Sequence, residues 1–334
     1  MELAGGSGPP FLEVDRIISF CGLHTTQVAG RSVLVLGTMR FRDAVELYDA
    51  ADGSPINSID VGSRETNYGN LRTLLLPYPE QPLLLGGFSY RPIHVWQIPD
   101  GEVVAQWKAP GPWEAATVHE QGSVTTVAMA VEGTVRQLDA FTGREAGERL
   151  HAREGKSLFR RNTSELWSVA SSGPYLLAGS SSGDVWQWDA GSGDVVAVWK
   201  EAHSGPVLRM TAHEVAGRPV LATMGSDQAV RVWDVSDGTQ LGEDVWLSFD
   251  MPRPAFAAGG RLLIAGDHEL KQVDVLTGER GPVLARWEQP NPERTEFDYA
   301  IEEIAVGDMA GVEVVFAAST AAVWRLDAAT GEPV

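Results

Sequence analysis

The chain has 334 residues, 43 % of them hydrophobic, and a net charge of −19 from 26 basic and 45 acidic residues. A field of that sign repels nucleic acid and anionic membrane surfaces, so we expect neither as a partner. The single cysteine, Cys21, excludes an internal disulfide, and neither a signal peptide nor an apolar run of bilayer length is visible, which indicates a cytoplasmic protein.

In chain order, residues 1–10 (MELAGGSGPP) predict a flexible arm, and an apolar strand follows over residues 11–19. From residue 40 onward one pattern recurs: a strand ends in an aromatic or aliphatic residue followed by Asp (once Gln), and Gly stands four positions later. The seven copies are Tyr48-Asp49…Gly53, Trp96-Gln97…Gly101, Leu138-Asp139…Gly143, Trp188-Asp189…Gly193, Trp233-Asp234…Gly238, Val273-Asp274…Gly278 and Leu326-Asp327…Gly331. Successive copies lie 48, 42, 50, 45, 40 and 53 residues apart, and a period near 45 is the length of one four-stranded propeller blade.

The fifth copy shows the strands of one blade most clearly. A turn and an inner strand span residues 203–211, and further strands follow over 219–224, 229–234 and 240–247. The second strands are continuously apolar, as in Leu83-Leu84-Leu85, which indicates burial on both faces between neighbouring blades. The outer strands carry Trp107, Trp199, Trp246 and Trp287, which we expect to pack between blades.

The seventh copy reaches Gly331 without an outer strand of its own, whereas the strand over residues 11–19 precedes the first copy. We therefore expect this N-terminal strand to pair into the last blade and close the ring, which removes two open sheet edges. The sequence thus predicts an all-β, seven-bladed β-propeller, with one domain over residues 11–334 and an arm over residues 1–10.

The fifth copy also carries His203, Thr223, Asp227 and Trp233 at the spacing of the WD-repeat (tryptophan–aspartate repeat) propellers. The chain resembles that family over nearly its whole length, and the bias of 22 Arg over 4 Lys is typical of a GC-rich bacterial genome. The resemblance implies a buried hydrogen-bonded chain from the Trp N–H to the Thr hydroxyl, on to the His and then to the Asp. Such a network rigidifies a blade, so we interpret His203 and Asp227 as structural rather than catalytic.

The sequence holds no recognisable motif for a cofactor, a metal or catalysis. Asp49, Asp52 and Asp60 do not match the 12-residue calcium loop, and Asp-x-x-x-Gly instead predicts a turn. Copies three, six and seven are similar to quinoprotein-type repeats, but a quinoprotein enzyme usually has eight blades and a metal beside its cofactor. The chain has seven copies and no clustered metal ligands, so we expect no cofactor, no metal and no catalytic residue.

The loops that lead into the inner strands differ from blade to blade, while the framework repeats. Such loops carry binding function because the strands behind them are rigid, and aromatic residues and Arg are enriched in binding hot spots. Residues 151–161 are locally basic and either recognise an acidic group or form a solvated loop. The candidates for a binding face are Tyr68, Trp113, Glu114, Arg160, Arg161, Trp167, Asp250, Arg253, Asp298 and Tyr299.

These observations favour a non-catalytic scaffold that binds a protein or peptide through its loop-rich face. The alternative is an enzyme or small-molecule binder with a site in the central channel, assembled from several blades. Its candidate polar groups are Glu114, Arg160, Arg253 and Asp298. A third interpretation is a domain separated from a multidomain regulator. Charged side chains that converge on a deep channel would favour the second interpretation.

Overall fold

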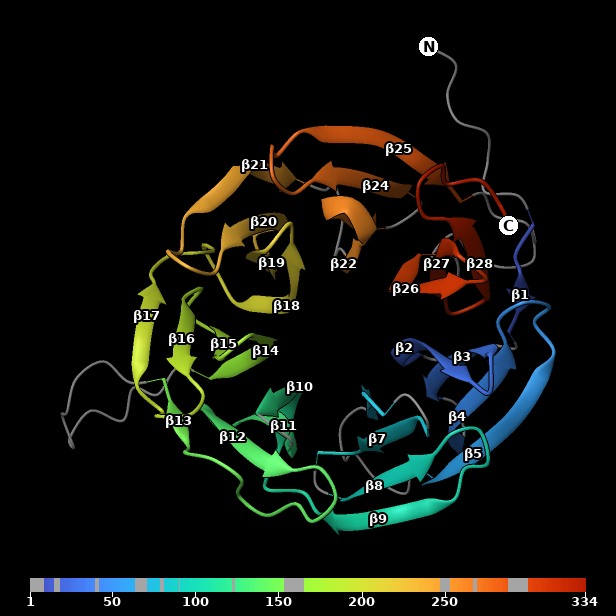
Figure 1. Cartoon of the computed structure of the whole chain (residues 1–334), viewed down its shortest axis with the longest axis horizontal. Coiled ribbons are helices and arrows are strands. Elements are labelled where there is room, and N and C mark those ends of the chain that lie inside the picture. The colour runs from blue at the N-terminus through green and yellow to red at the C-terminus, as the bar shows by residue number, and fades with distance from the viewer. Residues whose placement is uncertain are drawn as a thin grey trace.

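The computed structural model describes residues 9–14, 19–39, 42–63, 71–78, 81–89, 91–121, 124–152, 165–246, 253–266, 269–287 and 300–334. Within these ranges, 28 strands form seven four-stranded antiparallel sheets. Figure 1 shows the sheets arranged radially around a central axis, as the blades of a propeller. The predicted all-β, seven-bladed propeller is therefore confirmed. None of the helical structure in the described ranges is long and apolar enough to cross a bilayer.

The four strands of each blade follow one another from the central axis outwards. Blade 1 has β2 (Ser19–Val28), β3 (Arg31–Met39), β4 (Arg42–Asp49) and β5 (Pro55–Ser63), and blade 2 has β6 (Arg72–Leu76), β7 (Leu83–Gly87), β8 (Pro92–Gln97) and β9 (Val103–Lys108). Blade 3 has β10 (Trp113–Gln121), β11 (Val124–Val131), β12 (Thr134–Asp139) and β13 (Leu150–His151), and blade 4 has β14 (Leu166–Ser172), β15 (Tyr175–Ser180), β16 (Val185–Asp189) and β17 (Val195–Trp199). Blade 5 has β18 (Val207–Val215), β19 (Arg218–Gly225), β20 (Ala229–Asp234) and β21 (Gln240–Trp246). Blade 6 has β22 (Arg253–Ala257), the 3-10 turn η1 (Ala258–Gly260), β23 (Arg261–Gly266), β24 (Glu269–Asp274) and β25 (Arg280–Arg286), and blade 7 has β26 (Ile301–Met309), β27 (Val312–Ser319), β28 (Ala322–Asp327) and β1 (Leu12–Glu13).

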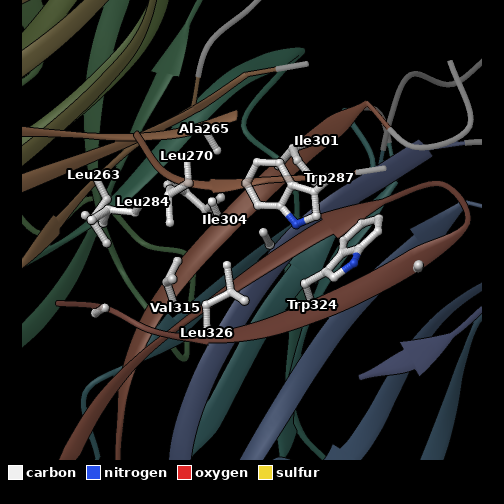
Figure 2. Close-up of a cluster of buried hydrophobic side chains, with 14 of the residues drawn as sticks. Leu263, Ala265, Leu270, Leu284, Trp287, Ile301, Ile304, Val315, Trp324 and Leu326 are labelled. Atoms are coloured by element: carbon white, nitrogen blue, oxygen red, sulfur yellow. The ribbon is translucent and has the colours of Figure 1, made fainter. Parts of the chain in front are cut away.

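The hydrophobic core lies between the blades rather than within any one of them. At each junction, buried side chains from two neighbouring sheets form one cluster. Figure 2 shows the cluster between blades 6 and 7, where Leu263 and Leu270 of one sheet face Val315 and Leu326 of the next. Both faces of the middle strands are buried in this way, which is why those strands are continuously apolar in the sequence.

Glycine is required at each of the seven turns that follow a third strand for two reasons, the backbone conformation of the turn and the closeness of the preceding blade. Each Gly N–H donates to the backbone oxygen of the residue four positions earlier, and φ lies between +63° and +77°. Each Gly also lies against the outer strand of the preceding blade. A Cβ on Gly143 would stand 2.5 Å from the Trp107 ring, and one on Gly238 would stand 2.6 Å from Trp199 Nε1. A side chain at these positions is thus disfavoured by the local backbone and by the neighbouring blade.

The outer-strand Trp residues pack between blades in three of the four cases. Trp107, Trp199 and Trp287 are buried, and the Trp107 indole donates to the backbone oxygen of Ala140 in the next blade at 3.0 Å. The expectation for Trp246 was wrong, because this side chain is 56 % exposed. The register explains the difference. Trp107 pairs with Ile93 and Trp199 pairs with Val185, whereas the equivalent Val230 of blade 5 pairs with the buried Val245. Trp246 lies one position further along the strand and therefore points to its other face.

The N-terminal segment closes the ring, as predicted. In β1, Leu12 pairs with Val323 and Glu13 pairs with Ala322, while the Val14 N–H donates to the Ala321 oxygen at 3.0 Å. The paired strand is shorter than the predicted span over residues 11–19, because Ser19 already belongs to β2 of blade 1 and residues 15–18 lie outside the described ranges.

Two side chains hold the closure together. The Phe11 ring lies 6.0 Å from that of Phe316 in blade 7. The Arg325 guanidinium stands 4.4 Å from the centre of the Phe11 ring and donates to the Ala50 oxygen of blade 1 at 2.7 Å. The first and last blades are thereby joined through a segment from the start of the chain.

Removal of residues 1–14 is expected to lower the melting temperature by roughly 10 °C, because Phe11, Leu12 and the buried Val14 leave an open edge and an unfilled junction. Circular dichroism during heating measures this. A variant that lacks only residues 1–8 is the control and should melt like the full chain. Equal melting temperatures for both deletions would contradict closure by this segment.

Candidate functional site

The seven inner strands surround the central axis. In the order β2, β6, β10, β14, β18, β22 and β26, each contacts the next, and β26 contacts β2 (Figure 1). Each is the innermost strand of its sheet and begins its blade's run through the sheet, so all seven run the same way along the axis. We call the end of the ring where they begin the loop face, and the end where they turn into the second strands the hairpin face. The loops expected to bind a partner belong to the loop face.

A β-bulge recurs near the start of five inner strands. In each case the pairing with the second strand skips one residue, and the skipped residues are Cys21, Glu114, Trp167, Leu208 and Glu302. A bulge frees its extra residue from the ladder and redirects it. Accordingly, Trp167 is 40 % exposed and the Glu114 side chain is 52 % exposed. Two of the predicted face residues therefore lie at the loop face because of a backbone irregularity.

The other predicted face residues divide into two groups. Trp113 is 1 % exposed and Arg253 is 7 % exposed, so neither side chain is displayed to a partner. Trp113 pairs with Val131 beside the bulge and packs in the core between blades 2 and 3. The remaining candidates lie outside the described residues, and they are Tyr68, Arg160, Arg161, Asp250, Asp298 and Tyr299.

Charged side chains converge near the beginnings of the inner strands. Arg72 of blade 2 pairs with Glu114 of blade 3 at 3.0 Å. Glu303 of blade 7 lies 2.9 Å from Arg209 of blade 5 and 4.0 Å from Arg253 of blade 6. The Glu303 carboxylate thus links blades 5, 6 and 7, although blades 5 and 7 are not neighbours. Arg209 and Glu303 are not among the residues predicted from the sequence, since no local pattern shows that strands from non-adjacent blades approach each other at the axis.

The environment of this carboxylate changes the ionisation of its neighbours. Burial lowers the pKa of Arg253 to about 10, and the nearby positive charge of Arg209 adds to the effect. Burial also lowers the pKa of His24, whose Nε2 lies 3.0 Å from Thr73 Oγ1, although the negative charge of Glu303 opposes this shift.

The four residues expected to form the buried network are hydrogen-bonded to one another. The Trp233 indole donates to Thr223 Oγ1 at 2.9 Å, Thr223 lies 2.8 Å from His203 Nε2, and His203 Nδ1 lies 2.8 Å from Asp227. Arg231 Nη1 joins the same network, since it lies 2.6 Å from His203 Nδ1 and donates to Asp227 at 2.9 Å. Each of the four side chains is bonded to the next, so the network stabilises blade 5 without an exposed reactive group.

The aspartates of the repeated turns are engaged in the turns themselves. Asp274 Oδ1 accepts the backbone N–H groups of Leu276 at 3.0 Å and of Thr277 at 2.8 Å, and the Thr277 bond lowers the pKa of Asp274. Asp49 likewise accepts from Ala51 and pairs with Arg31. Among the residues that the structure describes, no three His, Cys, Asp or Glu side chains are grouped so as to hold a metal ion.

Comparison with known proteins bears on the fold alone. No protein-family model matches the chain, and no curated protein sequence matches it. The β-propeller domain of Cps50 (Swd1) from Myceliophteria thermophila is similar in structure, with a TM-score of 0.66 at 16 % identity over 96 % of this chain and 97 % of that one. The computationally designed Ika8 protein gives a TM-score of 0.62 at 13 % identity over 96 % of this chain and 100 % of that one. The chain thus has a WD40-like seven-bladed fold.

The blade 5 network predicts a loss of stability in acid. Burial alone would raise the pKa of Asp227, but hydrogen bonds from Arg231 and His203 outweigh it and lower the pKa to about 2. In the unfolded chain the Asp227 carboxyl has a pKa near 3.8. The stabilisation of the folded chain by ionised Asp227 is therefore present above pH 4 and is lost as the pH falls towards 2. Urea unfolding at pH 5, 4 and 3 measures this loss. Between pH 5 and pH 3 the free energy of unfolding should fall by about 1 kcal/mol less in Asp227→Asn than in the wild type. The control is Asp237→Asn, which changes an exposed aspartate of the same blade and should behave like the wild type. An equal dependence of the free energy of unfolding on pH in all three proteins would contradict the role given to Asp227.

Proposed function

We propose that this protein is a non-catalytic scaffold that binds a protein or peptide through its loop face. The observation that carries the proposal is the exposed indole of Trp167, held at a bulge of a rigid inner strand. Trp is the residue type most enriched among binding hot spots, and here it lies on a strand whose neighbours are buried. The WD40-like fold supports the proposal, since such propellers typically bind proteins.

The composition of the loop face fits a protein partner. Glu114 of blade 3 occupies the same bulge position as Trp167 of blade 4, so the face presents an acidic and an aromatic side chain at matched height. Leu208, at that position in blade 5, packs against the core between blades 5 and 6. A rigid frame with different side chains at equivalent positions can recognise an extended surface without reorganising. We place this scaffold in the cytoplasm of a bacterial cell, on the strength of its composition.

A small-molecule site at the central axis is the second candidate function. It is favoured by the cluster of Arg209, Arg253 and Glu303, in which three blades contribute charged groups to one place. Two cations around one carboxylate would suit an anionic ligand that replaces or bridges to Glu303. The same ion pairs connect blades 5, 6 and 7, which is a structural role in itself, so we rank this candidate second.

The scaffold proposal is tested by comparative affinity capture from lysate of the source organism. Trp167→Ala and Glu114→Ala should each reduce recovery of the specific partner about tenfold, because each removes a displayed side chain of the loop face. Trp246→Ala is the matched control, since Trp246 is equally an exposed Trp but lies on an outer strand. It should recover the partner fully. Full recovery by all three variants would overturn the proposed face and leave the axial site as the better candidate.

A further inference from the structure

The outer strands of the blades differ in how their free edges are protected. An edge strand presents backbone N–H and C=O groups that pair with another strand unless a charge, a proline or a short length prevents it. Strands β1 and β13 have only two residues each, and β5, β21 and β25 carry Asp60, Glu243 and Pro282 between their ends. The two remaining outer strands, β9 and β17, have none of these devices, since they read Val-Val-Ala-Gln-Trp-Lys and Val-Val-Ala-Val-Trp.

Strand β9 exposes apolar side chains next to its free edge. Val103 is 49 % exposed and Val104 is 43 % exposed. The strand is the last of its sheet and lies on the outer rim of the ring, at the bottom of the view in Figure 1. Within the part of the chain that the structure describes, no strand pairs with its outer edge. The edge of blade 2 is therefore a template for a further strand.

The charges at the two ends of this edge are complementary to each other. Glu102 precedes the strand and Lys108 ends it, both are exposed, and Ala105 lies midway between them. If two copies of the strand pair antiparallel with Ala105 on a two-fold axis, Glu102 of each copy lies beside Lys108 of the other. The same register brings Val103 beside Trp107 of the other copy. The edge thus fits itself in both charge and apolar character.

We propose that two copies of this chain associate through antiparallel pairing of their β9 strands, which joins the two blade 2 sheets into one. The contact is a single short strand on each side, so the dimer is transient, with a dissociation constant on the order of 100 μM. The net charge of −19 on each copy opposes the approach, so the dimer requires an ionic strength of about 0.15 M, where charges further apart than about 8 Å are screened. This inference does not depend on the proposed function, because β9 lies on the rim and contributes nothing to the loop face.

Blade 4 provides an internal comparison for this edge. Val196 of β17 is 50 % exposed and is skipped in the pairing with the third strand, as Val104 of β9 is. The lysine that follows β17 is already engaged, since Lys200 lies 3.4 Å from Asp184 and 5.7 Å from the centre of the Trp186 ring. Val196→Lys is therefore a matched control for Val104→Lys, with the same residue type, exposure and place in the blade.

The test is sedimentation velocity of the full chain over roughly 5 to 500 μM at an ionic strength of about 0.15 M. The weight-average mass should rise with concentration from 36.0 kDa towards twice that value. Val104→Lys should abolish the rise, because it places a charge inside the paired edge, whereas Val196→Lys should behave like the wild type.

A charge swap tests the register. Glu102→Lys and Lys108→Glu should each weaken the dimer at least about tenfold, because each places like charges beside one another. The double variant should associate within about threefold of the wild type, because the two charges again attract. The two single variants change the net charge in opposite directions, so a loss in both reports the local contact and not the overall repulsion.

Three results would overturn the proposal. One is a wild type that stays at the monomer mass up to the highest concentration. Another is loss of association in Val196→Lys together with its retention in Val104→Lys, which would assign the contact to blade 4. The third is a double variant that associates as weakly as the single ones, because the two side chains would then not meet. Partner capture by the Trp167 variant has no bearing on any of these outcomes, so the scaffold proposal and this one fail separately.

Discussion

The turn glycine of each blade lies against the outer strand of the blade before it, and this contact determines how the seven sheets fit together. Side-chain donors of the preceding blade then reach a backbone oxygen of the same turn: Trp107 bonds to Ala140, Gln187 to Val235 and Arg261 to Ala328. Arg325 does the same for Ala50 at the closure, where Gly53 faces Phe11 of the N-terminal segment. A blade buries its core only against its two neighbours, so the contact has to be made at every junction before the ring is stable.

In this ring the buried framework and the exposed side chains occupy different places along the axis. The middle strands are buried, and His203, Thr223, Asp227 and Trp233 are hydrogen-bonded to one another within blade 5. The ends of the inner strands carry the side chains that vary. At the loop face, bulges release Trp167 and Glu114 towards solvent, while Glu303 ties three blades together.

The sequence predicted the architecture because the turn requirement is local. A glycine four residues after the aspartate is needed by φ and by the neighbouring blade at once, so the period is visible without coordinates. Other features depend on contacts that a single sequence does not encode. Trp113 and Glu114 are adjacent, but Trp113 packs in the core between blades 2 and 3, whereas Glu114 is the unpaired residue of a bulge and is exposed. Trp246 belongs to an outer strand, as Trp107 and Trp199 do, but it is exposed because it lies one register position beyond theirs. Arg209 and Glu303 meet only because the ring brings blades 5 and 7 together at the axis.

The most direct test of the central contact compares two glycines of blade 5 that share the same backbone conformation. Gly238 has φ +73° and faces Trp199 of the preceding blade, whereas Gly217 has φ +78° and a Cβ added there would have no atom within 4 Å. Urea unfolding should show that Gly217→Ala costs about 1 kcal/mol, from backbone strain alone, and that Gly238→Ala costs about 3 kcal/mol, because the added methyl group also separates two blades. Equal losses for the two variants would mean that the glycines serve only the turns, and that the fit between blades has another origin.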